Sequence, residues 1–99
     1  MIRHVVTWKL AATDDAERAE QAETMARGLR SLPASIPEIR NLEVGVNVLN
    51  PGSNFHLVLI ADYEDEAALQ RYQEHPEHQK VAAYIPTVVG DRSAVDFLV

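Results

Sequence analysis

The sequence predicts an α+β fold in which helices cover one face of a single antiparallel sheet. Three observations lead to this prediction. Apolar residues alternate with other residues along four segments, at 2–10, 40–49, 55–63 and 94–99, as expected of strands. They recur at helical spacing between the first and second segments, and again between the third and fourth. The predicted order is therefore strand, helix, strand, strand, helix, helix, strand.

The composition is that of one globular domain, residues 1–99. The chain is 46% hydrophobic and 24% charged and has no cysteine, which excludes a disulfide framework, a thiolate zinc site and a cysteine nucleophile. Its net charge of −6 argues against nucleic acid and against anionic membrane surfaces as partners. The apolar run at the N-terminus is too short and too interrupted for a signal peptide or a membrane span, so we expect a cytoplasmic protein.

The first strand and the first helix both present an apolar face. The strand face carries one histidine and consists of Ile2, His4, Val6, Trp8 and Leu10. Asp14 and Glu17 resemble a capping box at the helix start, and Pro33 is expected to end the helix. The inward helix face is rich in alanine and consists of Ala19, Ala22, Met25, Ala26, Leu29 and Leu32. Such small side chains either let the helix pack closely on the sheet or leave space for another group, and we favour close packing.

Residues 40–49 and 55–63 form the second and third strands, joined by a turn at 50–54 that is rich in asparagine, proline and glycine. The third strand is apolar on both faces along its middle. We therefore expect it to be central and covered on both sides. One face carries Phe55, Leu57, Leu59, Ala61 and Tyr63, and the other carries His56, Val58, Ile60 and Asp62.

A corner at His75-Pro76 separates the last two helices. Proline is tolerated at the first position of a helix, because its missing N–H would have no partner there. The residue before a proline avoids the helical conformation, so His75 lies at the corner itself. Tyr72 then lies on the last turn before the corner and His78 on the first turn after it. The corner thus gathers three side chains that can exchange protons.

The order of elements is that of a ferredoxin-like plait, a split β-α-β repeat with four antiparallel strands. Asp65 caps the first helix of the final pair, and the second helix is expected to end at Pro86. Residues 90–92 then lead into the last strand. Because the helices would leave one apolar sheet face open, we expect two sheets to pack face to face in a homodimeric α+β barrel.

His78 is the strongest candidate for a functional residue. A neutral imidazole titrates near neutral pH, and the hydroxyl group of Tyr72 could polarise a carbonyl group or guide a proton. The alternative is that His78 only braces the bend through hydrogen bonds. For His75 we favour such a structural role.

His4 and His56 lie on strands that we expect to be adjacent. With their apolar neighbours Trp8 and Val58 they would form a polar spot in an apolar cavity, suited to a small ligand with a carbonyl or hydroxyl group. The alternative is that both histidines are satisfied core residues and that Trp8 belongs to the core or to an interface.

Metal ions and cofactors are not expected. His75 and His78 with a third histidine could hold a metal ion, but the corner at Pro76 breaks the continuous helix that usually presents such a pair. Glu43 and Asp96 lie on strands, where a role at a dimer edge or as solvated charges is as common. The sequence has no phosphate loop, dinucleotide-binding glycine motif or serine nucleophile motif.

Three stretches of the chain occur together in one known family. They are Ile2-Arg3-His4-Val5-Val6 followed by Trp8-Lys9-Leu10, Tyr72 followed by His75-Pro76-x-His78, and Val95-Asp96-Phe97. On these residues the chain resembles the stress-responsive A/B barrel domain, or dimeric α+β barrel, over essentially its whole length. The resemblance implies a homodimer of ferredoxin-like subunits.

One branch of that family, the plant polyketide cyclases that make olivetolic acid, closes a linear poly-β-keto thioester by aldol condensation. The resemblance to this branch implies that His78 is the base, that Tyr72 assists it, and that His4 and His56 line the pocket. This chain departs from the branch in its first helix, which carries alanines and Met25 where bulkier aromatic pocket walls are expected.

Two hypotheses about function follow. In the first, the protein is a cofactor-free enzyme in which His78, aided by Tyr72, moves a proton α to a carbonyl group of a small, mostly apolar substrate. In the second, it is a non-catalytic, stress-associated or ligand-binding homodimer in which the same residues only stabilise the bend and the pocket. A ferredoxin-like monooxygenase or isomerase shares the fold without the corner motif and is the third choice.

Overall fold

The computed structural model describes residues 1–99 and has the predicted order of elements. The strands are β1 (Ile2–Leu10), β2 (Asn41–Val46), β3 (Leu57–Tyr63) and β4 (Val89–Leu98). The helices are α1 (Asp15–Arg30), α2 (Glu66–Glu74) and α3 (Pro76–Val88), with a short 3-10 helix at Leu32–Ala34. All neighbouring strands are antiparallel, in the order β2-β3-β1-β4. The predicted ferredoxin-like α+β fold is confirmed.

The helices begin where the sequence supplies caps. The Asp14 carboxylate accepts a hydrogen bond from the Glu17 N–H at 2.8 Å, and Asp65 accepts one from the Ala68 N–H at 2.8 Å. His75 lies between α2 and α3 with extended backbone angles (φ −64°, ψ 136°). Its Nδ1 accepts the Glu77 N–H at 3.1 Å. The corner is therefore held by a histidine that caps α3, as its structural role predicts.

Several element ends differ from the expected ones. α3 contains Pro86 and continues to Val88, because the missing N–H leaves only the Ala82 carbonyl without its usual donor. The Val89 N–H still donates to the Ile85 carbonyl and closes the final turn. β4 consequently begins at Val89, ahead of the expected residue 94. β2 is shorter than the segment 40–49, and β3 starts two residues after position 55.

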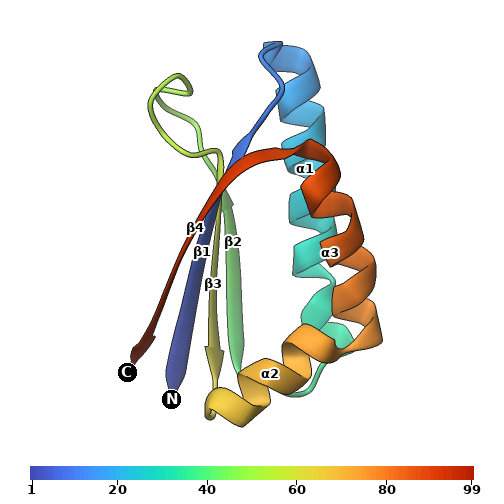
Figure 1. The fold of residues 1–99 in the computed structure, drawn as a ribbon, viewed down its shortest axis with the longest axis vertical. Coiled ribbons are helices and arrows are strands. Elements are labelled where there is room, and N and C mark those ends of the chain that lie inside the picture. Colours follow the sequence, from blue (N-terminus) through green and yellow to red (C-terminus); the bar gives the residue numbers. More distant parts are fainter.

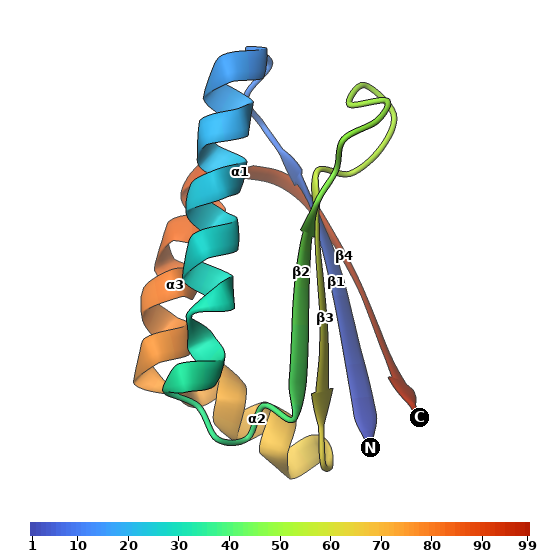
Figure 2. The same cartoon turned by 180° about the vertical axis from the view of Figure 1, so that it is seen from behind.

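The helices cover only one face of the sheet, as Figures 1 and 2 show from opposite sides. Residues on this inner face are buried, including Val6 and Trp8 of β1 and Leu57 and Leu59 of β3. β3 is an inner strand, as expected, between β2 and β1. Within one chain the helices cover only its inner face, so the expected cover of its outer face would have to come from a second chain. The outer face is nevertheless apolar, and cross-strand pairing brings together Val5, Val58, Ile60, Val95 and Phe97.

β4 forms an edge of the sheet and is exposed along almost its whole length. In the register with β1, Trp8 lies opposite Arg92, Val6 opposite Ala94 and His4 opposite Asp96. Directly opposed residues of an antiparallel pair point to the same face, so these β4 side chains share the inner face with the core. None of the helices is long and apolar enough to cross a membrane.

Candidate functional site

A cavity of about 250 Å³ lies between the inner face of the sheet and helices α2 and α3. Its walls are mostly apolar and come from Val6, Trp8, Leu29, Leu59, Ala82, Ile85 and Pro86. Its polar lining consists of His4, Tyr72, Gln73, His78 and Arg92. An apolar pocket with a few convergent polar groups is the usual form of a small-molecule site.

The corner between α2 and α3 fixes the protonation pattern of His78. The His78 Nδ1 lies 3.0 Å from the backbone carbonyl oxygen of Gln73. A carbonyl oxygen only accepts hydrogen bonds, so Nδ1 carries the proton and donates it, and Nε2 of the neutral ring has the lone pair. Burial lowers the pKa of His78 below its usual value of 6.5, and nearby His4 and His75 disfavour its charged form further. The ring is thus a neutral base at the cavity wall.

Tyr72 lies beside this ring and is buried. The ring centroids of Tyr72 and His78 are 4.5 Å apart, with an interplanar angle of 56°. Burial raises the pKa of Tyr72, so its hydroxyl group keeps its proton at neutral pH and can act as a hydrogen-bond donor. A neutral imidazole and a protonated phenol therefore line the same end of the cavity.

Tyr63 stands behind Tyr72, with ring centroids 4.9 Å apart. Its hydroxyl group is buried and has no hydrogen-bond partner. Burial raises the pKa of Tyr63 far above the ordinary value for tyrosine. An uncompensated buried hydroxyl costs free energy, typically about 1–3 kcal/mol.

His4 is buried and donates from Nδ1 to the Asp96 carboxylate across the β1–β4 pair. Asp96, for which the sequence left an edge or solvated role open, thus has a partner within the chain. The carboxylate orients the imidazole and keeps the proton on Nδ1, because the hydrogen bond at one ring nitrogen decides which nitrogen is protonated. His4 reaches the cavity from β1, on the side opposite α3.

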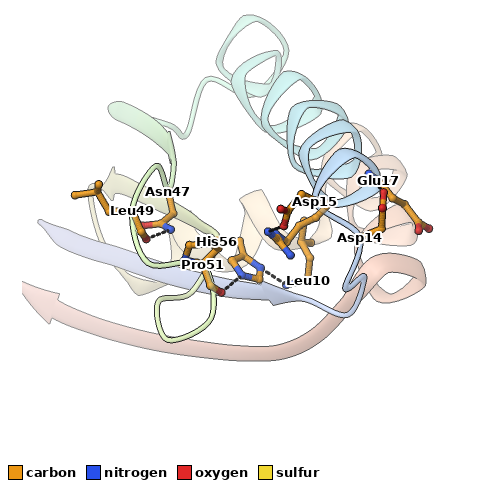
Figure 3. A network of polar contacts seen from close by, with 9 residues as sticks. Leu10, Asp14, Asp15, Glu17, Asn47, Leu49, Pro51 and His56 are labelled. Atoms are coloured by element: carbon orange, nitrogen blue, oxygen red, sulfur yellow. Dashed lines mark hydrogen bonds and ion pairs between the residues drawn. The ribbon is translucent and has the colours of Figure 1, made fainter.

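His56 lies elsewhere, at the end of the sheet near the N-terminus of α1. Figure 3 shows it between two backbone partners: its Nδ1 accepts the Leu10 N–H at 3.0 Å, and its Nε2 donates to the Pro51 carbonyl at 2.9 Å. A separate pocket of about 200 Å³ lies beside it, next to Ala19 and Ala22. Both ring nitrogens are occupied, so His56 holds the 47–56 loop to β1.

The expected polar spot shared by His4 and His56 is not formed. Residue 61, not residue 56, lies opposite His4 in the sheet, and His56 pairs near the far end of β1. Val58 points to the outer face, because side chains alternate along β3 and its neighbours Leu57 and Leu59 point inward. Of the candidate residues, the structure brings His78, Tyr72, His4 and Trp8 together and leaves out His56 and Val58.

Three contributors to this cavity were not found from the sequence. The Gln73 carbonyl is a backbone group, and the sequence carries no signal for it. The contact of Asp96 follows from pairing the first and last strands in register. The sequence predicts that Arg92 lies in the segment leading into the last strand; because β4 begins at Val89, Arg92 belongs to the strand and lies on its inner face, opposite Trp8.

No group of three or more histidine, cysteine, aspartate or glutamate side chains is arranged to hold a metal ion. At the corner, the Nδ1 atoms of His75 and His78 are each engaged with backbone groups. The cavity side chains themselves can bind a ligand, polarise it and exchange protons with it.

Comparisons with known proteins agree with the fold. Residues 2–99 match the model of the Stress responsive A/B Barrel Domain. An uncharacterized protein of Streptomyces coelicolor is 31% identical over 81 residues, which is 80% of each chain. A dimeric ferredoxin-like protein from Thermobifida fusca is 33% identical with a TM-score of 0.81, covering 99% of this chain and 90% of that one.

A dimeric protein with a ferredoxin-like fold from Bacteroides fragilis is similar to nearly the same extent. It is 28% identical with a TM-score of 0.87, and the match covers 97% of this chain and 93% of the other. The family match spans nearly the whole sequence, and the fold of these relatives is the one described above. The chain belongs to the stress-responsive A/B barrel domain family.

Proposed function

We propose that this protein catalyses a cofactor-free proton transfer at the carbon α to a carbonyl group of a small, mostly apolar substrate. His78 is the base and Tyr72 assists it. The observation that carries the proposal is the pair of side chains on the wall of an apolar cavity. A neutral imidazole with Nδ1 engaged on Gln73 has its ring centroid 4.5 Å from that of a protonated tyrosine, with the two rings tilted by 56°.

The chemistry needs only these groups. Nε2 of His78 takes a proton from the α-carbon, and the electron pair of the C–H bond moves into the enolate. The Tyr72 hydroxyl donates a hydrogen bond to the carbonyl oxygen, where the negative charge develops. Return of the proton from the imidazolium to the α-carbon regenerates the ketone. Attack of the enolate on a second carbonyl group instead gives an alkoxide, which the imidazolium protonates to the aldol product. A low dielectric in the cavity strengthens the hydrogen bond to the enolate.

The closing of a polyketide-like chain is the finer form of this proposal, and it rests on the resemblance to the plant cyclases. The cavity of about 250 Å³ accommodates a small substrate, and the alanine-rich face of α1 lies mostly against the sheet instead of widening it. We therefore propose a short ketone or β-keto compound as the substrate.

A simple test is hydrogen–deuterium exchange at the α-carbons of 2-octanone in D₂O, followed by NMR. The wild-type protein should exchange these hydrogens well above the buffer rate. His78→Gln should reduce the enzymatic rate by about 10²-fold or more, the usual scale for a lost general base. Tyr72→Phe should reduce it by a smaller factor, because the base remains. Exchange equal to buffer in the wild type, or unchanged in H78Q, rules out the proposal.

The second candidate is a binding protein without catalysis. The cavity alone favours it, since an apolar pocket with polar groups binds ligands whether or not a reaction follows. This candidate function predicts that 2-octanone binds without exchange of its α-hydrogens and that H78Q changes only the affinity for 2-octanone. The exchange experiment separates the two candidates directly.

We also propose that two chains form a homodimer through their outer sheet faces. The apolar patch formed by Val5, Val58, Ile60, Val95 and Phe97 supports this, because Val95 and Phe97 are large apolar residues that are otherwise 59% and 43% exposed. Phe97→Asp places a charge in that patch and should produce monomers in analytical ultracentrifugation. Thr24→Asp, on the solvent side of α1, is the matched control and should remain dimeric. A wild-type monomer contradicts the proposed assembly.

A further inference from the structure

Arg92 is a cavity residue without an ionic partner. It lies on β4 opposite Trp8 and lines the cavity, although its own side chain is exposed. Trp8, its neighbour across the sheet, is buried, whereas Arg92 is exposed, so Arg92 lies at the solvent-exposed edge, or mouth, of the cavity. The outer sheet face is the opposite side of β4, so the proposed dimer leaves Arg92 open to the cavity.

Most other cations of the chain are already engaged. Arg3, Arg18, Arg40, Arg71 and Lys80 form ion pairs, and Arg30 donates to the Val44 carbonyl. The Arg92 guanidinium group forms neither kind of contact; the Arg92 backbone N–H donates to the Asp91 carboxylate. In a chain with 15 acidic residues and 9 basic ones, an unpaired guanidinium at a cavity mouth is available for an anion from outside.

The polar groups of the cavity lie at two separate ends. Arg92 and Asp96 are four residues apart on β4, which corresponds to about 13 Å at the usual rise of a strand. His78 and Pro86 are separated by about 12 Å along α3. Figure 1 shows that α3 and β4 run in opposite directions. The start of α3, with His78 and the neighbouring Tyr72, therefore lies at the same end of the cavity as Asp96 and its partner His4. Arg92, near the start of β4, lies at the other end, toward Pro86. Apolar side chains, including Val6 and Leu59, lie between the two ends.

We infer that Arg92 is a specificity-determining residue that anchors a carboxylate, and that the substrate is a medium-chain keto acid. Its carboxylate binds the guanidinium group at the mouth, its alkyl chain lies along Trp8 and Ile85, and its ketone reaches His78 and Tyr72. This inference rests on the proposed function for the position of the ketone. A single guanidinium offers one positive charge in a planar fork, which matches a monoanionic carboxylate better than a doubly charged phosphate.

Binding of 7-oxooctanoate and its neutral analogue 7-oxooctanamide tests the anchor. Both carry the same ketone and chain and differ only in the charged group. Isothermal titration calorimetry should give the wild-type protein a preference of about tenfold for the acid, the scale of a partly exposed charge-assisted contact. Arg92→Met should abolish this preference, because it weakens binding of the acid more than binding of the amide. Arg27→Met removes a cation on the solvent side of α1 and should keep the preference.

The outcomes separate the anchor from the catalytic proposal. Equal affinity for acid and amide in the wild type overturns the inference, and so does a preference that survives in R92M. A preference lost equally in R92M and R27M reflects net charge only and also overturns it. His78→Gln should keep the preference in binding while losing α-exchange. An Arg92-dependent preference without any exchange in the wild type supports the anchor and contradicts the catalytic role of His78.

Discussion

His78 and His56 are both partly or wholly buried histidines, yet their surroundings give them opposite capacities. His56 has both ring nitrogens occupied by backbone groups, the Leu10 N–H and the Pro51 carbonyl. His78 uses one nitrogen on the Gln73 carbonyl, and its ring lines an apolar cavity beside Tyr72. An imidazole with two fixed partners braces the chain, whereas one with a remaining lone pair in a cavity can take a proton from a ligand. The residue type alone does not separate these roles.

The largest expected difference between the two histidines is in the rate of hydrogen–deuterium exchange at 2-octanone. His56→Gln should leave exchange of 2-octanone within about threefold of wild type, against the loss of about 10²-fold or more expected for H78Q. The physical reason is that His56 does not line the cavity of Tyr72. Exchange measured by NMR at equal concentrations of folded protein checks the contrast. An equal loss in both variants would mean that the 47–56 loop controls the cavity.

For stability, we expect the larger effect at His56 and the smaller one at His78. His56→Ala leaves the buried Leu10 N–H without its acceptor and should lower the free energy of unfolding by about 2–3 kcal/mol. His78→Gln should cost less than about 1 kcal/mol, because the partner of His78 is a carbonyl near solvent and the glutamine amide can still donate to it. Urea unfolding followed by circular dichroism gives both values. A larger loss in H78Q than in H56A would make His78 the brace.

The pH dependence sharpens the assignment of His78. Its folded-state pKa is lowered by burial below 6.5, so the unfolded chain binds its proton first as pH falls. Stability of the wild type should therefore decline as pH falls from about 6.5 toward the lowered value, relative to H78Q at the same pH. The acidic limb of the exchange rate should have its midpoint below 6.5. A midpoint at or above 6.5 would contradict a desolvated neutral base.

The smallest expected effect concerns Tyr63, the neighbour of Tyr72 outside the cavity. Removing its unpartnered buried hydroxyl in Tyr63→Phe should leave stability unchanged or raise it by up to about 1 kcal/mol, since no hydrogen bond is lost. Exchange should stay near the wild-type rate. Thermal unfolding together with the NMR assay checks both. A marked loss of rate would place the Tyr63 hydroxyl in the path of the proton.

Much of the fold could be predicted because it depends on local rules. Alternation located the strands, Asp14 and Asp65 marked helix starts, and the proline after His75 set the corner. The errors concern ends: β4 begins earlier than expected, and Pro86 lies within a helix whose last turn closes through Val89. The ends of a strand depend on its backbone pairing with neighbouring strands. The sequence of one segment contains no information about that pairing.

The sequence by itself determined the order of elements, the family features, the corner that brings Tyr72 and His78 together, and the apolar character of both sheet faces. These depend on residues close in the chain or on periodic patterns. Only the tertiary structure decided that His4 joins them while His56 turns to Leu10 and Pro51, that Asp96 holds His4, and that Arg92 lies at the mouth of the cavity. Each of these contacts joins segments tens of residues apart, and their register is fixed by how the sheet and helices pack.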